Sequence, residues 1–213
     1  MSYGAQLPGT IYPDVAPLYF ADQDWKRADR ARYVTALAQH RPHMATVLDW
    51  ERDEQLPEVL VWAEEIAPLV ERIIIIPKVI GGVPRIPPRV GGREIVLGYS
   101  VPTRYAGTSV PPWEFGRRPV HLLGGSPAAQ MNAAHYLNVV SADGNYIQKM
   151  AIKYWQYFVA GRAEWAANRH WPTLAEANGG VRMDINDGHY EAFSRSCANV
   201  IAAWHALQEA SAP

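Results

Sequence analysis

The chain has 213 residues, of which 48% are hydrophobic, and its formal net charge is −1. This length and apolar content suit a single globular domain over residues 1–213, and the charge gives no overall sign of a nucleic-acid partner. Cys197 is the only cysteine, which excludes a disulfide framework and a cysteine zinc cluster. No stretch approaches the ~20 apolar residues of a membrane span, and the first residues lack a signal-peptide pattern. We therefore expect a cytoplasmic protein that does not associate with membranes.

The first half of the chain alternates short apolar runs with amphipathic segments. Three apolar runs that end near charged residues predict strands at Pro17–Asp22, Met44–Trp50 and Arg72–Lys78. Apolar residues at helical spacing predict helices between them, at Asp24–His40 and Leu56–Val70. The third run, RIIIIPK, is apolar on both faces, as the strands of a covered parallel sheet are.

The second half continues the alternation after two loops rich in Gly, Pro and Arg. The predicted elements are loops at Val79–Arg93 and Val101–Arg118, strands at Glu94–Ser100, Val120–Ser126 and Asn138–Gly144, helices at Pro127–Leu137, Tyr146–Ala166 and Tyr190–Leu207, and a possible short strand near Val181–Ile185. Regular alternation of strand and helix predicts an α/β protein with a parallel sheet. The fold we expect is a compact (β/α)8 TIM-like barrel in a single domain, and an open doubly wound sheet is the alternative.

Polar or glycine residues mark the ends of the predicted strands. They are Asp22, Asp24, Asp49, Lys78, Gly98, Tyr99, Gly124, Gly125 and Asp143. Because the carboxyl ends of parallel strands meet at one edge, we expect these groups to converge on one mouth. Carboxylates with different surroundings can divide into a nucleophile and an acid or base. The alternative is that each Asp is a helix cap or a turn residue.

Several other kinds of site find no support in the sequence. There is no phosphate-binding P-loop, no GxGxxG fingerprint and no GxSxG nucleophile elbow. The seven histidines do not have metal-ligand spacing. We therefore expect neither a cofactor nor a bound metal.

The two predicted loops between 79 and 118 are rich in arginine and aromatic residues. The arginines are Arg85, Arg89, Arg93, Arg104, Arg117 and Arg118, with Tyr105, Trp113 and Phe115 interleaved. Basic and aromatic side chains together can hold a phosphate backbone and stack on bases. The alternative is a solvated arginine-rich loop that is packed by its own aromatic residues.

The order of these elements resembles that of the tRNA-guanine transglycosylases. The similar stretches are TVLDW, IIIIPKV, IVLGYSVP, VHLLGGSP and VVSADGN, which lie between Leu18 and Phe158. The chain looks most like the shortened relatives, found in phages and bacteria, that insert 7-deazaguanine bases into DNA. The family's zinc cluster of Cys and His is absent, which makes DNA the better substrate than tRNA.

The resemblance implies a role for each strand end. Asp143 would be the nucleophile, Asp22 or Asp24 the catalytic acid and base, and Asp49 the acid that recognises the base. Lys78 stands where the family usually has Gln. Gly98 and Tyr99 would be the backbone segment that reads the edge of the base, and the ring of Tyr99 would stack on the base. Gly124 and Gly125 belong to the strand end before the nucleophile.

The function that the resemblance implies is exchange of guanine in DNA for a 7-deazaguanine base such as preQ0. The protein would be a pentosyltransferase with a covalent Asp-glycosyl intermediate, acting in the host cytoplasm if the chain is phage-encoded. The alternatives are another barrel enzyme that acts on glycosidic bonds, and a non-catalytic barrel that binds nucleic acid or nucleotides. The sequence does not determine the oligomeric state.

Overall fold

The computed structural model describes residues 3–9, 17–24, 27–103, 107–161, 171–180 and 185–210. It divides the chain into two compact units. The sheet unit comprises residues 2–123 and 136–143, and the helical unit comprises residues 124–135 and 144–213. We describe each unit separately, and the expectation of a single domain stays a prediction.

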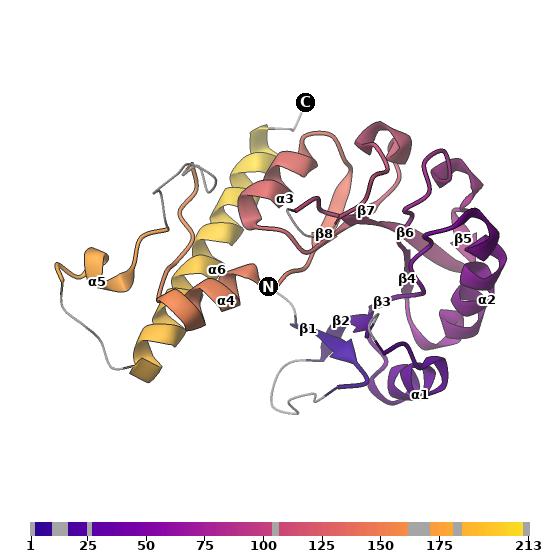
Figure 1. Ribbon diagram of the computed structural model, residues 1–213, viewed down its shortest axis with the longest axis horizontal. Coiled ribbons are helices and arrows are strands. Elements are labelled where there is room, and N and C mark those ends of the chain that lie inside the picture. Colours follow the sequence, from indigo (N-terminus) through magenta and orange to yellow (C-terminus); the bar gives the residue numbers. More distant parts are fainter. Residues whose placement is uncertain are drawn as a thin grey trace. The chain divides into compact units, whose positions relative to one another are not determined.

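The sheet unit contains a curled, mostly parallel sheet (Figure 1). Its strands are β1 (Tyr3–Leu7), β2 (Leu18–Gln23), β3 (Met44–Thr46), β4 (Arg72–Ile75), β5 (Arg89–Val90), β6 (Arg93–Ser100), β7 (Val120–Leu123) and β8 (Val139–Ala142). Seven of the described strands are parallel, in the order β1-β2-β3-β4-β6-β7-β8, and β5 pairs antiparallel with β6. The predicted α/β fold with a parallel sheet is therefore confirmed.

The sheet is a half-barrel and not the closed (β/α)8 barrel expected from the sequence. β1 and β8 end the strand order, and each pairs with a single neighbour among the described strands. After β8 the chain enters the helical unit, so no further described strand joins β8 to β1. The doubly wound alternative is also wrong, because the strands follow one another in sequence order without a reversal.

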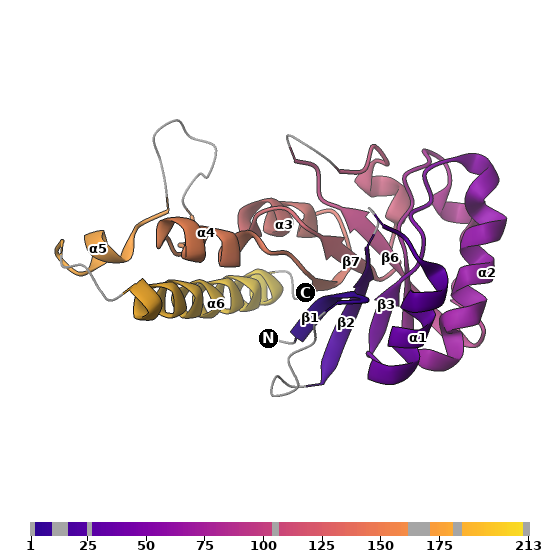
Figure 2. The ribbon, with the colours of Figure 1, turned by 60° about the horizontal axis from the view of Figure 1, so that its bottom comes forward.

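Two helices cover the outer face of the curl. They are α1 (Arg30–His40) and α2 (Leu56–Ile66), and Figure 2 shows both on the same side of the sheet. The side chain of Asp29 caps α1 by accepting the N–H of Arg32. Short 3-10 turns accompany these elements in the sheet unit, at η1 (Asp53–Gln55), η2 (Ala67–Leu69), η3 (Val83–Arg85) and η4 (Pro112–Phe115).

The inner face of the curl has its own apolar cluster. Its buried members are Phe20, Met44, Ile74, Ile76 and Val96, with Tyr19 and Leu123 packed against them. Their positions alternate with residues that face the helices, as the two-residue period of a strand requires. The half-barrel therefore has a packed apolar interior, and the polar residues at the strand ends lie at its edge.

The helical unit contains α3 (Pro127–Ala134), α4 (Tyr146–Tyr154), α5 (Leu174–Ala177) and α6 (Ile185–Ala210). α4 is shorter than predicted, because Trp155 takes a left-handed conformation at φ 54° and ends the helix. Ala151, Leu174 and Ala192 form a small core in this unit. Ile185 begins α6, and the rest of the strand predicted near 181–185 lies outside the described residues. No helix in the described ranges is long and apolar enough to cross a membrane.

Candidate functional site

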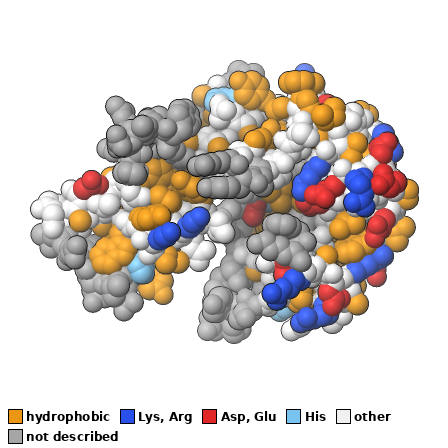
Figure 3. Space-filling view, viewed as in Figure 1, with side chains coloured by type: hydrophobic (Ala, Val, Ile, Leu, Met, Phe, Trp, Pro, Cys, Tyr) orange, Lys and Arg blue, Asp and Glu red, His pale blue; other side chains and the backbone are white. Residues whose placement is uncertain are grey.

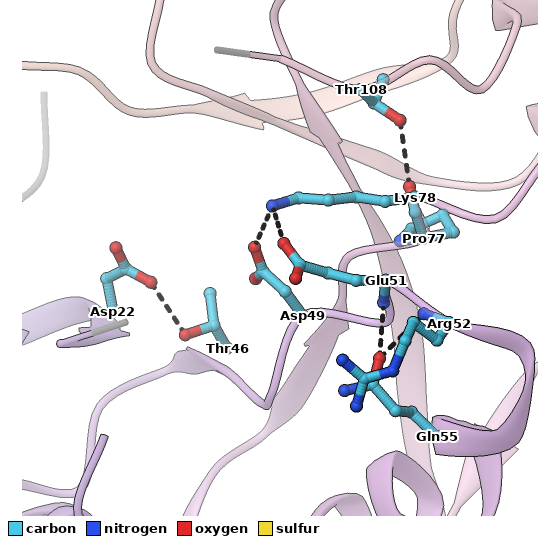
Figure 4. Close-up of polar contacts among 9 residues, drawn as sticks. All are labelled: Asp22, Thr46, Asp49, Glu51, Arg52, Gln55, Pro77, Lys78 and Thr108. Atoms are coloured by element: carbon cyan, nitrogen blue, oxygen red, sulfur yellow. Dashed lines mark hydrogen bonds and ion pairs between the residues drawn. The ribbon is translucent and has the colours of Figure 1, made fainter. Parts of the chain in front are cut away.

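Asp22 lies near the carboxyl end of β2 and is held by the neighbouring strand. Thr46 of β3 accepts the backbone N–H of Gln23 at 3.1 Å and donates its own hydroxyl to Asp22 Oδ1 at 2.9 Å (Figure 4). Burial raises the pKa of Asp22 from 3.8 to about 6, and the charges of Asp143 and Asp49 add to this rise. The hydrogen bond from Thr46 opposes it. Asp22 therefore changes protonation state near neutral pH.

Asp49 follows β3 and forms an ion pair that the sequence does not reveal. Lys78 Nζ lies 2.6 Å from Asp49 Oδ2 and 2.9 Å from Glu51 Oε1. In Figure 4 the Lys78 side chain extends from the segment after β4 toward both carboxylates. Burial raises the pKa of Asp49, although the hydrogen bond and charge of Lys78 oppose this. For Lys78, burial lowers the pKa, but Asp49 and Glu51 outweigh it and the net shift is upward.

Asp143 directly follows β8 and faces a buried histidine of β7. His121 Nε2 lies 3.5 Å from Asp143 Oδ1, and the Asp143 side chain is 34% exposed. The backbone N–H of Asp143 donates to the carbonyl of Leu122 at 2.9 Å, which fixes this residue against the end of β7. The N-cap position of α4 is Asn145, whose side chain makes no capping hydrogen bond, so the capping role given as the alternative for Asp143 stays a prediction.

The structure therefore brings three of the predicted acids together at the carboxyl edge of the sheet. The negative charges of Asp49 and Asp143 both raise the pKa of Asp22. Asp24 lies beyond β2, and its backbone carbonyl accepts the N–H of Arg27. Of the two candidates for the acid and base, Asp22 is the one that these interactions couple to the other carboxylates.

The predicted residues of β6 occupy opposite faces of the sheet. Gly98 faces the interior, where a Cβ atom would lie 2.5 Å from Ile76 Cγ1. Tyr99 is 5% exposed and packs edge-on against Phe115, with ring centroids 5.3 Å apart. Burial raises the pKa of Tyr99, so its hydroxyl stays neutral. A packed ring of this kind has no free face for a base, so the structure does not place Tyr99 as a stacking platform.

Gly124 and Gly125 follow β7 and belong to the helical unit. Both have left-handed φ values, of 65° and 78°, which suit glycine. The carbonyl of Gly124 accepts a hydrogen bond from Gln130 Nε2 at 2.8 Å. This contact connects the turn to α3 within the same unit.

Most of the predicted arginines do not approach the carboxylates. Arg93 donates to the carbonyl of Ala67, and Arg118 donates to the carbonyls of Ile86 and Pro87. Arg89 donates to the carbonyl of Gly92. These residues precede or begin β5, β6 and β7, so they lie toward the amino ends of the β6 and β7 strands.

Arg117 also lies toward the amino ends of β6 and β7. It lines a surface pocket of about 430 Å³ together with Pro88, Glu94, Ile95, Arg118 and Pro119. The pocket is therefore separate from the carboxylates, which follow their strands. Arg104 lies outside the described residues.

Arg85 is the exception among the predicted loop arginines that the structure describes. It pairs with Asp53 and lies over the ring of Trp50, 5.2 Å from the ring centroid. Trp50 follows Asp49 directly, and its backbone bonds to both Ile76 and Lys78. Arg85 is thus held at the carboxyl edge, on the loops that follow β3 and β4.

His121, Thr46 and Ser141 are the site residues that sequence reasoning missed. His121 stands in the middle of an apolar strand and not at its tip, so a search of strand ends passes over it. The usable signal is the period of two, because Val120 and Leu122 are buried on one face while His121 faces the other. Among the described residues, no group of three or more His, Cys, Asp or Glu could hold a metal ion.

Fold and site together define an α/β protein whose curled parallel sheet carries a cluster of coupled carboxylates at its carboxyl edge. Residues 6–205 match a family of unknown function (DUF6610), and the chain belongs to that family. No curated protein and no solved structure is similar to it.

Proposed function

We propose that this protein is a base-exchange transglycosylase that replaces guanine in DNA with a 7-deazaguanine base such as preQ0. The observation that carries the proposal is the coupling of Asp22, with a pKa of about 6, to the carboxylates of Asp49 and Asp143. An acid that titrates near neutral pH can give and take a proton in one catalytic cycle. The resemblance of VHLLGGSP and VVSADGN to the transglycosylases supports the choice of reaction.

In the first half-reaction, a carboxylate oxygen of Asp143 attacks C1′ of the nucleotide. The C1′–N9 bond breaks, its electron pair leaves with guanine, and protonated Asp22 gives its proton to a ring nitrogen of the departing base. The product is a glycosyl ester of Asp143 and free guanine. The exposed third of the Asp143 side chain gives the sugar access to it.

In the second half-reaction, the Asp22 carboxylate takes the N9 proton of the incoming base. The N9 electron pair attacks C1′, the ester bond breaks, and the Asp143 carboxylate is restored. Asp49 accepts hydrogen bonds from the N–H groups on the pairing edge of the purine. The hydrogen bond and charge of Lys78 favour the charged, accepting form of Asp49 and oppose the effect of its burial.

A base inside a duplex must be flipped out to reach such a site. Of the predicted loop arginines that the structure describes, Arg85 is the one placed to hold the backbone beside such a site. Trp50 lies fully buried beneath Arg85 and supports it. The other described arginines of the two loops lie toward the opposite strand ends and take no part in this proposed contact.

The test is incubation of the protein with guanine-containing duplex DNA and labelled guanine or preQ0. Incorporation of the label into DNA, with release of guanine, supports base exchange. Release of sugar without incorporation supports a glycosidase that uses the same acids. Binding of DNA with neither reaction supports a non-catalytic protein, and both of these outcomes overturn the proposal.

A further inference from the structure

His121 is a buried histidine on the inner face of the half-barrel. It is 1% exposed, and its ring lies against Phe20 of β2, with centroids 4.6 Å apart. Both ring nitrogens of a buried imidazole need a partner, because an unpaired buried polar group loses its hydrogen bonds to water without replacement. The neighbours of the two nitrogens therefore determine which nitrogen carries the proton.

The two nitrogens have different neighbours. Nδ1 lies 2.8 Å from the hydroxyl oxygen of Ser141 on β8, and that oxygen lies 3.7 Å from Met44 Sδ. Nε2 makes no hydrogen bond within the described part of the chain, and Asp143 Oδ1 stands 3.5 Å from it. This gap is a few tenths of an ångström longer than an N–H···O hydrogen bond.

The position of the proton follows from these neighbours. With the only proton on Nδ1, the Nε2 lone pair would face a carboxylate oxygen, and the two would repel. The hydroxyl of Ser141 can turn from Met44 and donate to Nδ1 instead, because a hydroxyl hydrogen rotates freely. The proton then resides on Nε2 and points toward Asp143, which is an attractive arrangement.

We propose that His121 is a positioning residue for Asp143. Ser141 fixes the tautomer of His121, and the Nε2–H group orients the carboxylate of Asp143 for attack. The proposal rests on the nucleophilic role given to Asp143 above. The 3.5 Å gap closes when substrate fills the site, since catalytic hydrogen bonds are often long in free enzymes.

The first experiment needs no substrate. Nitrogen-15 NMR of the histidine ring in the whole protein reports which nitrogen carries the proton. We expect the proton of neutral His121 on Nε2 in the wild type. We expect a shift toward the Nδ1 tautomer in both Ser141→Ala and Asp143→Ala. A wild-type ring protonated on Nδ1, or one indifferent to both substitutions, overturns the proposal whatever reaction the protein catalyses.

The second experiment measures the reaction. His121→Phe keeps a ring against Phe20 but removes both nitrogens, and we expect the rate of covalent adduct formation to fall by a factor on the order of 100 with KM unchanged. His121→Gln places an amide N–H near the position of Nε2 and restores part of the rate. Ser141→Ala gives a smaller loss in the same direction, and it serves as the second variant if His121→Phe does not fold.

The matched control is His43. Its ring stacks on Tyr19 at 4.7 Å, and its Nδ1 pairs with Glu71 at 2.7 Å, so it is a second histidine with an aromatic and a carboxylate neighbour. His43→Phe should leave the rate unchanged. A wild-type rate in His121→Phe overturns the positioning role. If the wild type exchanges no bases but its tautomer depends on Asp143, the proposed function fails and the His121–Asp143 coupling stands.

Discussion

Individual carboxylates in this site differ because their surroundings differ. Asp22 and Asp24 are two residues apart and look alike in the sequence, but Asp22 accepts a hydrogen bond from Thr46 and its pKa is raised by burial. Burial of a carboxylate disfavours its charged form, so Asp22 weakens the fold at neutral pH. A residue that costs stability where it is charged is typical of a functional site.

Asp22→Asn should therefore stabilise the protein at pH 7.5. The wild-type pKa is 3.8 in the unfolded chain and about 6 in the folded one, so the unfolded state loses its proton first as the pH rises. The free energy of unfolding should fall by at most ~3 kcal/mol between about pH 4 and pH 6. It should then stay at this lower value at higher pH. The variant lacks this fall, and Asn can still accept the hydrogen bond from Thr46. Urea unfolding at pH 4.5 and 7.5 measures the difference.

Thr46→Val provides the opposite change for the same test. It removes the hydrogen bond that lowers the pKa of Asp22, so the fall in stability should extend to higher pH than in the wild type. Equal stability of wild type and Asp22→Asn at both pH values would show that Asp22 is not destabilised by burial.

Asp143→Asn should abolish base exchange and leave the fold intact. Asn is nearly isosteric with Asp but has no anionic oxygen to attack C1′, so no covalent intermediate forms. Asp143 lies beyond the end of β8 with a third of its side chain exposed, so we expect a change in unfolding free energy within about 1 kcal/mol. Adducts between DNA and protein on a denaturing gel, together with incorporation of labelled base, measure the loss.

The matched control for this substitution is Asp29→Asn. Asp29 accepts the N–H of Arg32 as the cap of α1, and Asn is an equally good cap, so exchange should continue at the wild-type rate. Exchange by Asp143→Asn at the wild-type rate would remove Asp143 as the nucleophile.

At the scale of elements, the sequence predicts the long periodic segments and misses the short ones. The apolar run at Ile73–Ile76 and the periodic segment in α2 are both found where predicted. β1 and β5 are missed because five or two residues hold too little pattern to distinguish from a loop. The end of α4 is missed because Trp155 carries no sequence mark of the left-handed conformation that it adopts.

The same reasoning explains which parts of the site were predictable. Asp49 and Asp143 could be placed at one edge because they follow strands that the pattern made parallel. The ion pair of Lys78 with Asp49 depends on side-chain rotamers, which no periodicity encodes. The role of His121 could not be predicted, because it depends on the face of the sheet to which the side chain points. That face is known only once the register between β6 and β7 is known.

Gly98→Ala should destabilise the sheet by about 1–3 kcal/mol, the usual cost of overpacking. The new Cβ would meet Ile76 Cγ1 at 2.5 Å and Leu123 Cδ1 at 2.9 Å, both in the packed interior. Thermal or urea unfolding measures the loss. Combining Gly98→Ala with Ile76→Ala should cost less than the sum of the two single changes, because the second removes the atom that the first meets. Additive costs would show that the interior is not tight at Gly98.

At the scale of the whole molecule, the predicted site residues with charged side chains lie on two edges of the sheet. The face of the sheet unit seen in Figure 3 has Lys and Arg side chains beside Asp and Glu side chains, in keeping with the net charge of −1. A curled parallel sheet collects its strand ends into two rims, and residues on opposite rims cannot serve one small site. The sequence alone could not show which arginines lie on which rim. The loop from 79 to 88 runs from the carboxyl end of β4 to β5, which pairs with the amino end of β6, so it passes from one rim to the other.

Arginines on the two rims should therefore contribute differently to DNA binding. Arg85 lies beside the carboxylates, so Arg85→Gln should weaken binding and flatten the slope of log K against log salt by about one unit, the effect of one lost phosphate contact. Arg117 lines the pocket at the opposite rim, so Arg117→Gln should leave both the affinity and the slope unchanged. The two substitutions remove the same charge from exposed side chains, so a difference between them reports position and not net charge.

Fluorescence anisotropy of labelled duplex DNA between 50 and 200 mM salt, roughly the range over which such contacts are resolved, gives both quantities. Equal slopes for both variants and the wild type would mean that DNA does not contact the carboxyl rim through Arg85. A flattened slope for Arg117→Gln alone would place the backbone on the opposite rim, away from Asp143, and would contradict the proposed site.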